Sequence, residues 1–78
     1  MKINRDLIKE RIWSKYMPYI KPDNKRKTTS IINMACCDLG IKERQVFNLL
    51  AGEKVSLKLL KKVIEIYDIE PQDLFINE

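Results

Sequence analysis

The stretch that decides the fold runs from Ile32 to Gly52 and reads Ile-Asn-Met-Ala-Cys-Cys-Asp-Leu-Gly-Ile-Lys-Glu-Arg-Gln-Val-Phe-Asn-Leu-Leu-Ala-Gly. Two helices that cross steeply over a short turn need a small side chain at their close approach, a glycine in the turn and an apolar residue directly after it. They also need apolar residues three apart on the second helix. These positions are filled, in order, by Cys36, Gly40, Ile41, Val46 and Leu49. The spacing predicts a helix-turn-helix unit over about residues 32–52.

Helical periodicity continues on both sides of this unit, and no segment alternates like a strand for more than a few residues. We therefore expect an all-α chain of five helices with a long first helix. Pro18 is expected to kink or end that first helix near Met17. The first expected helix covers residues 4–20, and the second starts at one of the N-cap candidates Thr28, Thr29 and Ser30 and runs to Leu39. The third and fourth cover residues 42–51 and 56–67. The fifth starts at Glu70, with Pro71 in its first position.

Length and composition favour one small globular domain over residues 1–78. The net charge of +4 is unevenly distributed, since residues 1–27 carry +6, residues 28–62 carry +3 and residues 63–78 carry −5. A basic front and an acidic tail allow one face to approach a polyanion. No segment has the roughly 20 apolar residues of a membrane span, and the N-terminus does not resemble a secretory signal, so we expect a cytoplasmic protein.

Catalytic and metal chemistry are not expected. The sequence contains no histidine, and its two cysteines, Cys36 and Cys37, are adjacent, without the two-residue gap of zinc or redox motifs. Neither a pair of carboxylates in an apolar setting nor a phosphate-cradling glycine loop is present. We therefore expect no enzyme, no metal and no cofactor.

The segment from about residue 28 to residue 76 resembles the lambda-repressor-like Cro/CI (XRE-type) family of DNA-binding domains. Gly52 is similar to the glycine that closes the recognition helix of that family. Residues 55–63 (Val-Ser-Leu-Lys-Leu-Leu-Lys-Lys-Val) look like its capped fourth helix, and residues 69–75 (Ile-Glu-Pro-Gln-Asp-Leu-Phe) look like its closing segment. The resemblance implies that the second helix of the unit lies in the major groove while the first crosses the phosphate backbone.

The resemblance also implies which residues touch DNA. On a helix over residues 42–51, Arg44, Gln45 and Asn48 share the side opposite the buried residues and are the base-reading candidates, because arginine suits guanine while glutamine and asparagine suit adenine. Phosphate contacts are expected at the start of the first motif helix, at the entrance to the second and in the loop after it. The residues at these places are Lys25, Arg26, Lys27, Thr28, Thr29, Lys42, Lys54 and Ser56.

Phe47 and Leu50 stand where the family commonly has polar residues, and with Glu43 they form a second stripe on the recognition helix. Three explanations are open: the first helix, with Trp13 and Tyr16, covers the stripe; Phe47 contacts a thymine methyl group; or the stripe binds a protein partner. The expected function is that of a sequence-specific double-stranded DNA-binding regulator, a Cro-like repressor acting as a homodimer. The alternative is a protein-binding module, such as an inhibitor or an antitoxin-like partner, that reuses the fold.

Overall fold

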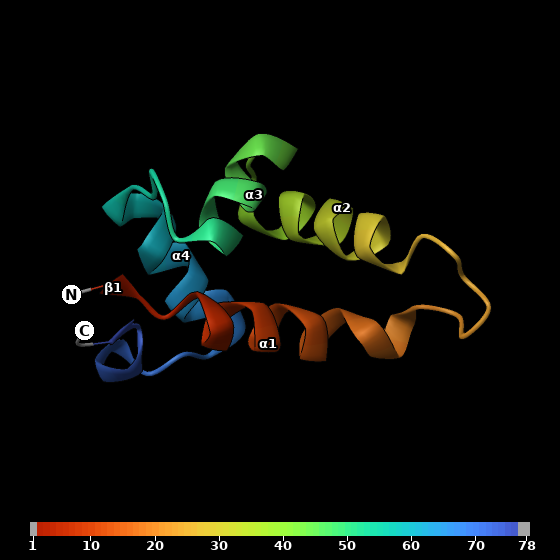
Figure 1. Cartoon of the computed structure of the whole chain (residues 1–78), viewed down its shortest axis with the longest axis horizontal. Helices are drawn as coiled ribbons and strands as arrows, with labels where there is room; N and C mark the ends of the chain where they lie inside the picture. Colours follow the sequence, from red (N-terminus) through yellow and green to blue (C-terminus); the bar gives the residue numbers. More distant parts are fainter. Residues whose placement is uncertain (1, 77–78) are drawn as a thin grey trace.

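The computed structural model describes residues 2–76, which are mostly helical (Figure 1). The described part contains four α-helices, two short 3₁₀ turns and one two-stranded sheet. In chain order the elements are β1 (Lys2–Ile3), α1 (Arg5–Tyr16), η1 (Met17–Tyr19), α2 (Lys27–Leu39), α3 (Glu43–Ala51), α4 (Leu57–Tyr67), η2 (Pro71–Asp73) and β2 (Phe75–Ile76). None of the helices in this part of the chain is long and apolar enough to cross a bilayer.

The molecule measures 38 × 21 × 20 Å along its principal axes, and two helices define the longest of these. Helices α1 and α2 lie side by side and are joined by a loop at one end (Figure 1). Helix α3 packs on both α1 and α2, and α4 also contacts both. The sheet lies at the end opposite the α1–α2 loop, where α4 begins. The α2–α3 pair thus packs against α1 and, through α2, against α4.

The core is one cluster to which every α-helix contributes, because each presents an apolar stripe at helical spacing. The most deeply buried side chains come from α1, α2, α3 and α4 alike. The largest residues with under 2% of their surface exposed are Ile8, Ile12, Ile31, Leu39, Val46, Leu49 and Val63. The apolar positions expected to face inward from the helix-turn-helix unit, Val46 and Leu49, are confirmed as part of this core.

The first helix is shorter than expected. Helix α1 ends at Tyr16, and the Met17 N–H makes the last helical hydrogen bond, to the Trp13 carbonyl. Pro18 has no N–H to continue this pattern, so the chain forms the 3₁₀ turn η1 over Met17–Tyr19. The expected break near Met17 is confirmed, whereas the expected continuation to residue 20 is wrong.

The expected fifth helix is also wrong, and the prediction of an all-α chain was incomplete. After Pro71 the chain makes only the turn η2 and then the strand β2, which pairs antiparallel with β1 in the register Lys2↔Ile76 and Ile3↔Phe75. Asn4 explains the change, because its backbone N–H donates to the Leu74 carbonyl at 2.7 Å and its side-chain Nδ2 to the Asp73 carbonyl at 3.1 Å. These two bonds and the sheet hold residues 73–76 against the N-terminal segment instead of in a continued helix.

The start of the second helix differs as well. Helix α2 begins at Lys27, so its N-cap is Arg26 rather than one of the three hydroxyl residues that follow. Asn24 shapes this entry, since its Oδ1 accepts the Arg26 N–H at 2.7 Å and its Nδ2 donates to Ser30 Oγ at 3.3 Å. Thr28 and Thr29 therefore lie within the first turn of α2 with exposed side chains.

Candidate nucleic-acid interface

The turn that joins α2 to α3 is short and closed by several hydrogen bonds. Gly40 ends α2 in the left-handed region, with φ of 66°, which L-residues with a side chain rarely adopt. The N–H groups of Gly40 and Ile41 both donate to the Cys36 carbonyl. The Lys62 ammonium donates to the Leu39 carbonyl at 3.2 Å and so ties α4 to the end of α2. No pattern in the sequence indicated this contact.

The stripe on α3 that contains Phe47 and Leu50 is partly buried and partly exposed. Leu50 is half-buried and packs against the core, which agrees with the explanation by intramolecular packing. Phe47 keeps 48% of its side chain exposed. Tyr16, one of the residues expected to cover the stripe, is buried elsewhere: its hydroxyl donates to Asp38 Oδ2 at 2.6 Å and lies 2.9 Å from the Tyr67 hydroxyl. Intramolecular packing therefore accounts for Leu50 and leaves a large aromatic surface at Phe47.

The outer face of α3 carries polar side chains next to Phe47. Arg44 is exposed and Asn48 is half-buried, and at a spacing of four residues they share one side of the helix. Gln45 is exposed but already engaged, because its Oε1 accepts the backbone N–H of Lys42 at 3.0 Å. This bond is the glutamine half of a capping box, and it stabilises a helix start that lacks the usual Ser, Thr, Asn or Asp. The sequence contained the signal, a glutamine three residues after the cap position.

The start of α2 presents several groups that suit a phosphate. Lys25, Arg26, Thr28 and Thr29 are exposed, and Lys27 is half-buried. The Arg26 cap makes no side-chain hydrogen bond to the helix. The first N–H groups of a helix have no intrahelical partner, so those of the first turn remain available to an anion.

A second basic segment follows α3. Lys42, at the entrance to α3, and Lys54, in the loop after it, are exposed. Lys54 adopts a left-handed conformation with φ of 51°. Ser56 caps α4 by accepting the Leu59 N–H at 3.1 Å, which leaves its hydroxyl proton free to donate to another group.

These segments lie on both sides of α3. In Figure 1, α3 stands between the start of α2 and the loop over residues 53–56 along the long axis of the molecule. A helix with a polar outer face is therefore flanked by basic residues at both ends. The predicted base-reading residues lie together on α3, and the predicted phosphate-binding residues lie at the start of α2, at the entrance to α3 and in the loop after it.

Cysteine chemistry adds little at this surface. Cys36 is half-buried, and the pKa of its thiol is raised, chiefly by burial and then by nearby Glu43, so the reactive thiolate is disfavoured. Cys37 is exposed and reduced. Within residues 2–76, no three His, Cys, Asp or Glu side chains lie close enough together to hold a metal ion.

Comparison with known proteins gives no further assignment: no protein-family model, no curated protein and no solved structure matches the chain.

Proposed function

We propose that this protein is a lambda-repressor-like, sequence-specific double-stranded DNA-binding protein that represses transcription as a homodimer. The observation that carries the proposal is the outer face of α3, where Arg44, Phe47 and Asn48 are presented together beyond a tight turn and between two basic segments. An α-helix of this kind fits the major groove, and one in which the buried side is fixed by Val46 and Leu49 enters it without rearrangement.

In the proposed complex, different side chains of α3 contact different bases. The Arg44 guanidinium donates two hydrogen bonds to the O6 and N7 acceptors of a guanine, and Asn48 pairs with the N6 and N7 atoms of an adenine. Gln45 offers only its Nε2 donor while its Oε1 remains on the Lys42 N–H. Arg44 and Asn48 therefore supply most of the discrimination between sequences.

The flanking segments hold the helix in place on the duplex. Free N–H groups and threonine hydroxyls at the start of α2, with Lys25 and Arg26, bind phosphates on one side of the groove. Lys42, Lys54 and the Ser56 hydroxyl do so on the other side. These contacts bring affinity without sequence information, and they act where the protein meets DNA in the cytoplasm or the nucleoid. Repression follows because a protein seated in the groove excludes other proteins from the same site.

One observation favours a second candidate. Phe47 leaves an aromatic ring half in water on the very helix that would read DNA, and such a ring also suits a protein partner. In that case the domain would be an inhibitor or an antitoxin-like partner that binds protein through α3. The two candidates differ in the charge of what they bind, which makes them separable in solution.

Binding to a random-sequence DNA duplex, followed by fluorescence anisotropy at increasing salt, separates the two. A DNA-binding protein should bind at low salt, and log Kobs should fall linearly with log salt concentration, with a slope of about −0.9 for each phosphate neutralised. Little or no binding at low salt would contradict the proposal and favour the protein-binding alternative.

A further inference from the structure

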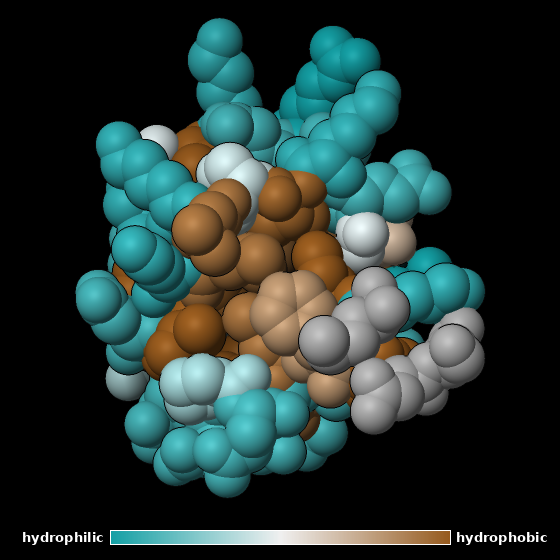
Figure 2. Space-filling view, turned by 90° about the vertical axis from the view of Figure 1, so that its left-hand side faces the viewer, coloured by the Kyte–Doolittle hydropathy of each residue, from teal (hydrophilic) through white to brown (hydrophobic). Residues whose placement is uncertain are grey.

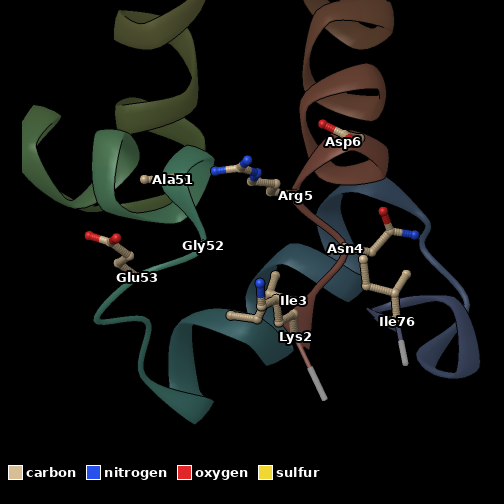
Figure 3. Close-up of a pocket in the computed structure, with 9 residues that line it drawn as sticks. All are labelled: Lys2, Ile3, Asn4, Arg5, Asp6, Ala51, Gly52, Glu53 and Ile76. Atoms are coloured by element: carbon tan, nitrogen blue, oxygen red, sulfur yellow. The ribbon is translucent and has the colours of Figure 1, made fainter. Parts of the chain in front are cut away.

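The end of the molecule that carries β1 and β2 combines apolar surface with charges of both signs. Figure 2 shows hydrophobic residues at the centre of this end and polar side chains around them. A hollow of about 500 Å³ lies between β1 with the start of α1 on one side and the end of α3 on the other (Figure 3). Two basic and two acidic side chains line it, namely Lys2, Arg5, Asp6 and Glu53. A phosphate gains little there, because the acidic groups oppose the attraction of the basic ones.

A smaller hollow has a different chemical character. It measures about 210 Å³ and lies between the α2–α3 turn, the first turn of α3 and the beginning of α4. Its polar side chains are Gln45, Ser56, Lys58 and Lys62, and no acidic side chain is among the described residues that line it. Each of these four side chains can donate a hydrogen bond, and two of them are cationic. The smaller hollow therefore suits an anion.

The donors of this hollow are not used up by contacts within the protein. Gln45 accepts the Lys42 N–H with its Oε1 and keeps both protons of its Nε2 for another acceptor. Ser56 accepts the Leu59 N–H and keeps its hydroxyl proton. Lys58 is exposed, so its ammonium can turn toward the hollow without loss of a buried contact.

The second cation of the hollow, Lys62, is held in place by the turn. Its ammonium donates to the Leu39 carbonyl at 3.2 Å, and this bond uses one of its three protons. A Cβ on Gly40 would lie 3.9 Å from the Lys62 Nζ, so the glycine leaves the ammonium uncovered on that side. Because the side chain is already ordered, an anion that binds it pays less conformational entropy than at a freely moving lysine.

We propose that this hollow holds one phosphate of the DNA backbone, bound by Lys58, Lys62 and the Nε2 amide of Gln45 beside the Ser56 hydroxyl. The inference deepens the proposed function, and rests on it for the source of the phosphate. It adds two lysines of α4 to the phosphate contacts. It also assigns Gln45 to the backbone instead of to a base, since its remaining donor group is then used on the phosphate.

The position of the hollow gives this phosphate a particular effect. The hollow lies at the start of α3, and Lys62 joins it to the end of α2. A phosphate bound there fixes how far the start of α3 enters the major groove, because phosphate contacts set the register and orientation of a protein on the duplex. Base recognition on α3 then falls to Arg44 and Asn48.

The first test is the salt dependence of binding to a random-sequence duplex. Lys58→Gln should make the slope of log Kobs against log salt concentration shallower by about 0.9, because one phosphate contact is lost. Lys61→Gln is the matched control: it removes the same charge from an exposed position of the same helix that does not line the hollow, and it should change the slope much less. Equal slopes for the two variants would overturn the role of Lys58.

The second test places a negative charge at the hollow. Gln45→Glu keeps an acceptor for the Lys42 N–H, and should weaken binding to every duplex by about tenfold or more, because its carboxylate repels the phosphate. Ser14→Glu is the control, since it changes the net charge equally at an exposed position of α1. If Gln45→Glu altered the preference at one base pair and left affinity for other duplexes unchanged, Gln45 would contact a base and the assignment would be wrong.

A titration of the full chain with inorganic phosphate, without DNA, identifies the source of the anion. In ¹H–¹⁵N spectra the amides of Gly40 and Ile41 and the side-chain amide of Gln45 should shift, and chloride at equal ionic strength should not shift them. Shifts at the hollow combined with an unchanged salt slope for Lys58→Gln would overturn DNA as the occupant. No shifts and an unchanged slope would overturn the hollow as a phosphate site, while salt-dependent DNA binding by the wild type would still support the proposed function. Shifts without any DNA binding would overturn the proposed function and DNA as the occupant together.

Discussion

Gln45 accepts the backbone N–H of Lys42 through its side-chain Oε1, at 3.0 Å, and so closes the first turn of α3. A lysine at the cap position has no acceptor with which to return the bond, so only the glutamine half of a capping box forms here. The glutamine therefore fixes where α3 begins, and with it the direction in which Arg44 points. Gln45, one of the predicted base-reading residues, therefore stabilises the start of α3.

Two substitutions of Gln45 separate support from reading. Gln45→Ala removes the cap and should lower the free energy of unfolding by about 0.5–1 kcal/mol. Gln45→Glu keeps an acceptor for the Lys42 N–H and adds a favourable charge in the first turn of α3, so its stability should equal or exceed that of the wild type. Urea unfolding followed by circular dichroism measures both. Equal stability of Gln45→Ala and the wild type would show that the cap contributes nothing.

Arg44→Ala should reduce affinity for the preferred DNA site by about 1–3 kcal/mol and relax the preference at one base pair. The reason is that alanine cannot donate the two hydrogen bonds offered to guanine. The measurement is a binding titration against the preferred duplex and its single-base variants. Arg11→Ala, an exposed arginine on α1 outside the proposed interface, is the control for loss of charge. An unchanged profile for Arg44→Ala would remove Arg44 from the reading residues.

Lys54→Asn should weaken binding to all duplexes alike and reduce the salt slope by about 0.9, because a phosphate contact carries no sequence information. Asparagine is chosen because it tolerates the left-handed conformation of residue 54, where φ is 51°. Lys61→Gln removes the same charge from the exposed side of α4 and should change the slope much less. If both variants had the same slope, the role of Lys54 would be one of general charge only.

The Tyr16–Tyr67 pair predicts how stability depends on alkaline pH. Burial, and then the hydrogen bond to Asp38, raise the pKa of the Tyr16 hydroxyl, and burial raises the pKa of Tyr67. The unfolded chain releases these protons near pH 10 while the folded chain retains them. Stability should therefore be unaffected by these groups below about pH 10 and should fall above it, by about 1.4 kcal/mol per pH unit for each tyrosine that stays protonated.

The double variant Tyr16→Phe/Tyr67→Phe should make this alkaline slope shallower, since it removes both hydroxyls together and leaves neither buried group without its partner. Guanidinium unfolding between pH 8 and about pH 11 measures the effect. Identical slopes for the variant and the wild type would mean that neither hydroxyl remains protonated in the folded chain at high pH.

The helix-turn-helix unit was predictable because its determinants are local. Gly40 needs a left-handed conformation, and the three-residue spacing of Val46 and Leu49 gives α3 a single apolar side; both features lie within a few residues of the turn. The end of the first helix near Pro18 was predictable for the same reason, because the missing N–H of proline removes a hydrogen bond within the same turn.

What the sequence did not reveal depends on residues far apart in the chain. The segment after Pro71 has the composition of a helix start, yet Asn4 binds the Asp73 and Leu74 carbonyls across 69 and 70 positions of sequence. The contact between Lys62 and Leu39 is equally remote, and no pattern distinguishes that lysine from its neighbours on α4. Local periodicity contains no information about such pairs.

The candidate site shows the same division. The polar outer face of α3 could be read from the spacing of Arg44 and Asn48, whereas the separation of Phe47 from Leu50 could not. Both residues belong to one apolar stripe in sequence, and only the packing of α3 on the core half-buries Leu50 and leaves Phe47 at 48% exposure.

The most direct test of the central claim is selection of bound sequences from a random pool of DNA duplexes by the full chain. We predict an enriched inverted repeat with half-sites about one helical turn apart, containing a guanine that the Arg44→Ala variant no longer requires. Bound duplexes in which no sequence is enriched over the starting pool would contradict sequence-specific reading by α3.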